Sequence, residues 1–132
     1  MTYPADIRAQ LIERHAAEGS WCAKGAVTAM LYDPLGDWRV FGHSGPLDVC
    51  IGCDLDQRCR KSVHAEMRVL MACVSAGAIP AGLHLMTTTA PCYRCAQLIV
   101  LARVTTVFYL DPYRETDGLT ILQTRGVKVH RV

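Results

Sequence analysis

The chain has 132 residues, enough for one domain that buries about two-thirds of the surface of its unfolded chain. Hydrophobic residues make up 51% of the sequence and charged residues 20%, a balance that excludes a disordered or fibrous protein. The formal net charge of +2 is too small to indicate an extended polyanionic partner, so nucleic acid is not expected. We therefore expect a single domain, residues 1–132, that acts on a small molecule.

Charges and cysteines indicate the compartment. Asp6, Arg8, Glu13 and Arg14 interrupt the N-terminal segment, so it lacks the apolar core of a signal peptide, and no later segment approaches membrane-spanning length. We therefore expect a soluble cytoplasmic protein with no membrane partner. Seven cysteines are many for such a chain, and an odd number cannot all pair within it. In a reducing compartment, clustered cysteines point first to a bound metal.

The first predicted elements are a helix and a hairpin. Ile7, Leu11 and Ile12 lie at helical spacing, which predicts an amphipathic helix over residues 6–17 with these side chains inward. A turn-forming segment with proline and glycine then separates two short apolar runs. These runs predict a β-hairpin with strands at residues 26–32 and 38–41.

Residues 42–62 have no helical or strand period and hold three cysteines, and irregular loops of that length are uncommon unless they bind something. Beyond the loop, helices and strands alternate. The next helix should turn four apolar residues inward (Val69, Leu70, Cys73 and Val74), whereas Gly118 weakens the prediction of the last helix. The predicted helices are residues 63–76, 92–103 and 115–125, and the predicted strands are residues 83–88, 104–110 and 127–132.

The predicted order is therefore α-β-β-α-β-α-β-α-β. Strands joined through a helix normally lie parallel with a right-handed crossover. The fold class is accordingly α/β: a three-layer α/β/α sandwich around a five-stranded mixed sheet. That sheet should have one antiparallel hairpin, three parallel strands and helices on both faces.

Two short strings carry the chemistry: His64-Ala65-Glu66, and Pro91-Cys92-Tyr93-Arg94-Cys95, each at the start of a predicted helix. Cysteines three apart on a helix share a face, and the positive helix start favours their thiolates. With His64 they give Zn²⁺ three protein ligands and leave the fourth position for water, which distinguishes a catalytic zinc from a structural one. Two thiolates weaken the pull of the ion on that water, so a base is needed, and Glu66 is placed to be that base without being a ligand.

Taken separately, these residues permit other interpretations. A Cys-x-x-Cys pair is also typical of a dithiol redox site or of half a structural zinc site, and a lone His64 or Glu66 would be an ordinary surface residue. Their combination favours catalysis, because His-x-Glu followed by Pro-Cys-x-x-Cys is the signature of zinc deaminases acting on cytosine or adenine. The alternative from a different class is a zinc or dithiol redox module without deaminase activity.

Further strings match a known family. They are Cys22 and Lys24 before the first strand, the loop Gly42-His43-Ser44-Gly45-Pro46, the run Cys59-Arg60-Lys61-Ser62-Val63-His64-Ala65-Glu66, Val107-Phe108-Tyr109, Tyr113, and Gly126-Val127-Lys128-Val129. With them the chain resembles the deoxycytidylate deaminase branch of the cytidine deaminase superfamily. The resemblance implies the cytidine deaminase-like fold with a parallel last strand, and hydrolytic deamination of a cytosine nucleotide, dCMP to dUMP and ammonia. It also implies a homo-oligomer, a dimer or a hexamer.

Within the enzyme class the alternative is deamination of another base, such as a modified pyrimidine, guanine or a tRNA adenosine. In the family a loop Asn holds the sugar, and Ser44 occupies that position here, while Arg68 occupies another Asn position. The Arg68 guanidinium suits a phosphate, but the residue is equally interpreted as an exposed helix position. The other candidate substrate contacts are His43, Ala65 and Tyr113, with Lys24, Arg60 and Arg114 as candidates for the phosphate.

The remaining cysteines suggest a second metal. Some family members hold a second zinc near these positions, so Cys22, Cys50, Cys53 and Cys59 are candidates for a four-cysteine structural site, with plain buried thiols as the alternative. Cys73 lies on the apolar side of its predicted helix and is expected in the core.

Overall fold

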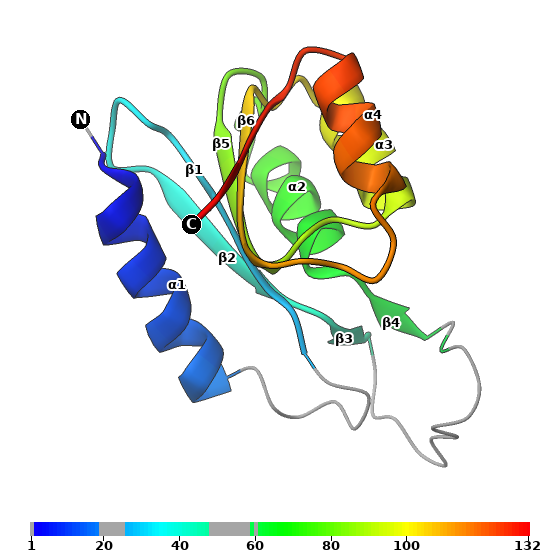
Figure 1. Cartoon of the computed structure of the whole chain (residues 1–132). Helices are drawn as coiled ribbons and strands as arrows, with labels where there is room; N and C mark the ends of the chain where they lie inside the picture. The colour runs from blue at the N-terminus through cyan, green and yellow to red at the C-terminus, as the bar shows by residue number, and fades with distance from the viewer. Residues whose placement is uncertain (1, 19–25, 48–58, 60) are drawn as a thin grey trace.

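A computed structural model of the chain describes residues 2–18, 26–47, 59 and 61–132. Helices and strands follow the predicted order, with one additional pair of two-residue strands (Figure 1). No helix in this part of the chain is both long and apolar enough to cross a membrane. The elements are α1 (Pro4–Glu18), β1 (Thr28–Tyr32), β2 (Arg39–His43), β3 (Gly45–Pro46), β4 (Ser62–Val63), α2 (Ala65–Ser75), β5 (His84–Thr89), α3 (Tyr93–Leu101), β6 (Thr106–Asp111), α4 (Asp117–Thr124) and β7 (Lys128–Arg131).

The main sheet has five strands in the order β2-β1-β5-β6-β7. β1 is antiparallel to both of its neighbours, β2 and β5, whereas β5, β6 and β7 are parallel to one another. The predicted mixed sheet, with its hairpin and its parallel last strand, is confirmed. The parallel strands all end at one edge of the sheet, where α2 and α3 begin.

The segment predicted as an irregular loop is paired at its ends, which corrects the prediction for residues 42–62. β2 continues to His43, and β3 and β4 form a separate antiparallel pair in which Gly45 lies opposite Val63. Two-residue strands give no periodic signal, because each contributes a single residue to each face. The pair brings the segment after β2 close to the start of α2.

Both faces of the sheet are covered. β1 shows the alternation of a strand buried on both sides: Ala29 and Leu31 pack toward α2, α3 and α4, and Met30 and Tyr32 pack in the cluster that includes Ile7 and Leu11 of α1. Figure 1 accordingly shows α1 on one side of the sheet and the other three helices on the opposite side. The three-layer α/β/α architecture is therefore confirmed.

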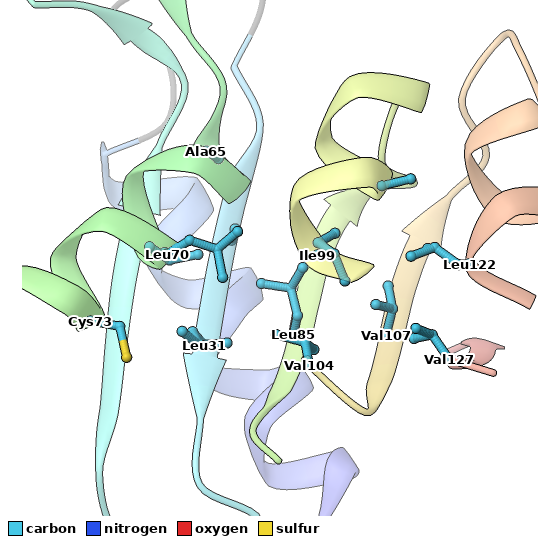
Figure 2. Packing of buried hydrophobic residues seen from close by; sticks show 13 residues of the cluster. Leu31, Ala65, Leu70, Cys73, Leu85, Ile99, Val104, Val107, Leu122 and Val127 are labelled. Carbon is cyan, nitrogen blue, oxygen red and sulfur yellow. The ribbon is translucent and has the colours of Figure 1, made fainter. Parts of the chain in front are cut away.

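The larger core cluster joins the sheet to α2, α3 and α4. Figure 2 shows Leu70, Ile99 and Leu122 from these helices meeting Leu85 and Val107 of the sheet. All five side chains are buried, so this layer fixes how the helices sit on the strands. The positions of the helix starts follow from this packing.

Two residues predicted to face inward do not. Val74 is 54% exposed on α2 and Ile12 is 41% exposed on α1, whereas the other inward predictions, including Cys73, are buried. Each misplaced residue directly follows a buried one, Cys73 or Leu11, and one residue turns about 100° around a helix axis. The buried stripe of each helix is therefore narrower than predicted.

We expect Val69→Ala and Ile79→Ala to differ strongly in their effect on stability. Val69 is fully buried, so its truncation should lower the free energy of unfolding by about 2–3 kcal/mol, whereas Ile79 is 76% exposed and Ile79→Ala should change it by less than about 0.5 kcal/mol. Both changes shorten a β-branched side chain to alanine. Urea denaturation at a fixed zinc concentration measures the difference, and equal losses would contradict the assigned burial.

Candidate metal centre and active site

The three predicted metal ligands come from the starts of two neighbouring helices. His64 is the N-cap residue of α2 and Cys92 is the N-cap residue of α3, and both have extended backbones with φ near −70°. Neither side chain forms a capping hydrogen bond with its own helix. Cys95 lies in the first turn of α3 and is buried. β5 leads through Ala90 and Pro91 into this turn, which places the site at the carboxyl edge of the parallel strands.

The distances among the donor atoms fit a tetrahedral zinc. His64 Nδ1 lies 3.5 Å from Cys92 Sγ and 3.3 Å from Cys95 Sγ, and all three atoms lie within 4.8 Å of one another. Zinc with bonds of about 2.3 Å to sulfur and 2.0 Å to nitrogen in tetrahedral geometry places such atoms about 3.5 Å apart. The three residues are therefore placed to bind a metal, and an imidazole with two thiolates is a zinc donor set. Among the described residues they are the one group of this kind.

The two cysteine thiols have opposite pKa shifts. The hydrogen bond from Cys95, together with one from His64, lowers the pKa of Cys92 to about 3 against the effect of burial. The same hydrogen bond to Cys92 and burial raise the pKa of Cys95. A metal ion that binds both sulfurs as thiolates must displace any proton that they carry.

Glu66 lies in the first turn of α2, two residues after His64, and is only 4% exposed. Burial raises the pKa of its carboxyl, opposed by a hydrogen bond from its own backbone amide and by the charge of His64. Its side chain also reaches the Cys95 thiol. A carboxyl group with a raised pKa, next to the metal ligands and away from bulk water, is suited to accept and return a proton.

Ser44 and Arg68 both bind backbone in this structure. Ser44 is buried, its Oγ accepts a 2.7 Å hydrogen bond from the Val27 amide, and its own amide donates to the Val27 carbonyl at 2.8 Å. Arg68 is half-buried rather than exposed, and its Nη2 donates to the carbonyls of Gly45 at 2.9 Å and Pro46 at 3.0 Å. Arg68 thus ties α2 to β3.

A buried threonine hydroxyl links His43 to α1, a contact that the sequence did not indicate. Thr28 Oγ1 lies 2.9 Å from His43 Nδ1 and 2.7 Å from His15 Nδ1, and the Thr28 amide donates to Thr88 Oγ1 at 3.1 Å. A hydroxyl has one proton, so it can donate to only one of the two imidazoles, and the other must donate to it. The tautomers of His15 and His43 are therefore linked. The only sequence signal was a polar residue, Thr28, within an apolar strand.

The structure describes some of the other predicted site residues and not the rest. Ala65 is buried at the start of α2, and Tyr113 is half-buried after β6 with the Arg114 guanidinium 5.5 Å from its ring centroid. Cys59 is half-buried. Lys24 and Arg60, and with them Cys22, Cys50 and Cys53, lie outside the described residues, so the second zinc site stays a prediction.

The sequence matches a known family over residues 12–111, the family of the cytidine and deoxycytidylate deaminase zinc-binding region. The match covers more than half of the chain and includes His64, Glu66, Cys92 and Cys95. The chain therefore belongs to this family of zinc-binding deaminases.

The dCMP deaminase of cyanophage S-TIM5, solved in complex with dCMP and dUMP, is similar in structure over 100% of both chains, with a TM-score of 0.84 and 25% identity. ComE operon protein 2 of Bacillus subtilis (strain 168) is 29% identical over 79 residues, which are 59% of this chain and 42% of that protein. The chain thus matches less than half the length of this relative.

More distant structures share the fold alone. A guanine deaminase from Nitrosomonas europaea has a TM-score of 0.60 at 16% identity, covering 99% of this chain and 78% of its own. A diaminohydroxyphosphoribosylaminopyrimidine deaminase/5-amino-6-(5-phosphoribosylamino)uracil reductase from Thermotoga maritima has a TM-score of 0.66 at 16% identity, covering 96% of this chain and 35% of its own. The fold therefore occurs in deaminases that are named for different bases.

We expect Cys92→Ala to lose one equivalent of zinc and Cys73→Ala to lose none. Both side chains are thiols on neighbouring helices, but Cys73 is buried in the core, away from His64 and Cys95. Zinc content after dialysis, measured by elemental analysis, distinguishes the two variants. Full zinc content in Cys92→Ala would exclude Cys92 as a ligand.

Proposed function

We propose that the protein hydrolyses the amino group of a cytosine nucleotide, converting dCMP and water to dUMP and ammonia. The observation that carries the proposal is the spacing of His64 Nδ1 from two cysteine sulfurs, which fits zinc, with the buried Glu66 beside them. The choice of nucleotide is supported by the whole-length similarity to the cyanophage dCMP deaminase. The family match supports the deaminase chemistry independently of that choice.

His64, Cys92 and Cys95 would hold the zinc. When bound there, zinc would supply a Lewis acid that lowers the pKa of a water molecule. Because two thiolates offset the charge of the ion, this activation is weaker than in a site with three neutral imidazoles. The chain must therefore provide a proton acceptor of its own.

Glu66 is that acceptor in our proposal. Its carboxylate takes one proton of the attacking water and passes it to the ring nitrogen. It then takes the proton of the hydroxyl now on the ring carbon and gives it to the departing amino group. A carbon–oxygen bond forms, the carbon–nitrogen bond breaks, and the proton count balances as ammonia leaves. Burial keeps bulk water from Glu66, so the proton stays between the carboxyl and the substrate.

We expect Glu66→Gln to abolish deamination while zinc stays bound. The amide keeps the shape of the side chain but cannot carry the proton, so kcat should fall by a factor of at least about 10²–10⁴. Loss of cytosine absorbance with dCMP measures the rate, and elemental analysis measures the zinc. Glu13→Gln, the same change at an exposed position of α1, is the control. A normal rate in Glu66→Gln would exclude Glu66 as the proton acceptor.

The same assay tests the substrate. Ammonia release is compared for dCMP, CMP, deoxycytidine, guanine and a tRNA stem-loop, and the highest kcat/KM is expected with dCMP. A higher value with guanine or with the RNA would overturn the choice of nucleotide and retain the deaminase. Release from none of them in the zinc-loaded protein would count against deaminase activity.

Substrate contacts also belong to this proposal. His43 is the last residue of β2 and Tyr113 follows β6, so both lie toward the edge of the sheet where the metal ligands begin their helices. Ser44 and Ala65 adjoin the same edge. The two carbonyl contacts of Arg68 favour a role in holding residues 45–46 over a direct role in binding phosphate.

We infer that the chain assembles as a homo-oligomer through the outer faces of α2 and α3. Met67, Met71 and Val74 form an exposed stripe on α2 at positions i, i+4 and i+7, and Leu98 and Leu101 are exposed on α3. Contiguous exposed apolar side chains on neighbouring helices are typical of a surface that another subunit covers.

Domain number and compartment are also part of the proposal. The whole-chain similarity to a deaminase supports a single domain. The free thiols of Cys92 and Cys95 suit the reducing cytoplasm.

We expect Leu101→Glu to shift the assembly toward the monomer and Leu35→Glu to leave it unchanged. The two leucines are equally exposed, at 78%, but Leu35 lies in the β1–β2 turn, away from both helices. Light scattering after size-exclusion chromatography gives the mass of each species. A monomeric wild-type protein would contradict the inference.

A further inference from the structure

Gly118 lies where α4 touches the metal loop. It is the second residue of α4 and is buried. A Cβ built at this position would lie 2.3 Å from the carbonyl oxygen of Pro91, 2.9 Å from the carbonyl carbon of Cys92 and 3.1 Å from its oxygen. A methyl group does not fit at the first of these distances. The first turn of α4 therefore rests directly on the backbone that carries a metal ligand.

The neighbouring backbone is held on other sides as well. The Ala90 amide donates to the Asp111 carbonyl at 2.9 Å, and the Cys92 carbonyl accepts a 2.9 Å bond from the Ala96 amide. These bonds fix the entry to the loop and the first turn of α3, but neither limits movement of the Pro91 carbonyl. The close approach of Gly118 limits the movement of this carbonyl toward α4.

The rest of α4 is anchored in the core. Leu122 is fully buried, and Leu119, one residue after Gly118, packs against the same cluster. Figure 2 shows Leu122 directed from α4 toward Ile99 of α3 and Val107 of β6. The contact at Gly118 is thus made by a helix whose position is fixed independently of the loop.

We propose that Gly118 is a positioning residue for the zinc centre: it lets α4 seat against Pro91 and Cys92, and so holds Cys92 Sγ at coordination distance from the ion. Zinc–sulfur bonds have a length of about 2.3 Å, so movement of the Cys92 backbone alters the fit of the site. A side chain at position 118 would force a shift of about 1 Å in either α4 or the loop, because carbon and oxygen do not approach as closely as a Cβ there requires. The inference rests on the three-ligand site and not on the choice of nucleotide.

This role accounts for a glycine inside a helix. Glycine has a lower helix propensity than alanine, so the first turn of α4 gains nothing from Gly118 as a helix former. The close approach to Pro91 gives a reason for glycine there, because every other residue carries the excluded Cβ.

The test compares Gly118→Ala with Gly126→Ala, without any substrate. Gly126 follows the C-terminal end of the same helix with φ +85°, and a Cβ there meets no atom within 4 Å, so alanine strains the backbone without reaching the loop. Zinc affinity is measured by competition with a chromophoric chelator. Gly118→Ala should bind zinc about 10- to 100-fold more weakly, the range seen for groups that orient metal ligands, and Gly126→Ala should bind as wild type.

The absorption spectrum of the cobalt(II)-substituted protein gives a second readout that a general loss of stability does not move. We expect a weaker thiolate-to-cobalt band in Gly118→Ala, because Cys92 Sγ is displaced, and an unchanged band in Gly126→Ala. Wild-type affinity and spectrum in Gly118→Ala would overturn the proposal. The proposal would also be overturned if both variants lost zinc affinity to the same extent and their melting temperatures fell to the same extent.

Should Gly118→Ala fail to fold, Leu119→Ala takes its place, because it loosens the first turn of α4 without adding atoms at the loop. Reduced zinc affinity in that variant supports the proposal, and wild-type affinity contradicts it. Since no substrate is used, failure here leaves the proposed deamination untouched, and failure of the Glu66→Gln test leaves the role of Gly118 untouched.

Discussion

The convergence of two helix starts at one edge of the sheet is the constraint on which the rest of the structure depends. His64 and Cys92 are the N-cap residues of α2 and α3, and their donor atoms lie within 4.8 Å of each other although 28 residues separate them. Both helices pack on the same face of the sheet, so their first turns lie side by side. The positive ends of the helices stabilise the thiolates that a metal needs. The main core positions the ligands, and the ligands give that edge of the sheet its chemistry.

Burial affects both the proposed proton acceptor and a metal ligand at this edge. It raises the pKa of Glu66, which suits the proposed role of taking and returning a proton, and it adds to the hydrogen bond with Cys92 in raising the pKa of Cys95. A zinc ion binding two thiolates activates water only moderately, so a strong proton acceptor next to it matters more than at a site with neutral ligands. Glu66, the proposed acceptor, lies only two residues after His64 at the start of the same helix, so the position of one fixes the position of the other.

Local patterns in the sequence were sufficient for the order of elements, the mixed sheet and the three ligands, because strand alternation, helical spacing and the two short motifs are all carried by neighbouring residues. Val74 and Ile12 were misplaced because one residue of error in helical phase turns a side chain from the core to solvent. The contact of Thr28 with His15 and His43, and that of Gly118 with Pro91, depend on elements that meet only after folding. No spacing in the sequence indicates them.

Ser44 and Arg68 stand at two positions where the family resemblance implies asparagine, and the structure shows them acting on the same segment. The short Ser44 side chain binds the Val27 amide at the entry to β1, and the long Arg68 side chain spans from α2 to the carbonyls of Gly45 and Pro46. Ser44 belongs to the segment after β2, and Arg68 binds two carbonyls of the same segment. The two departures from the family pattern therefore act together, because both tie this segment to the rest of the fold.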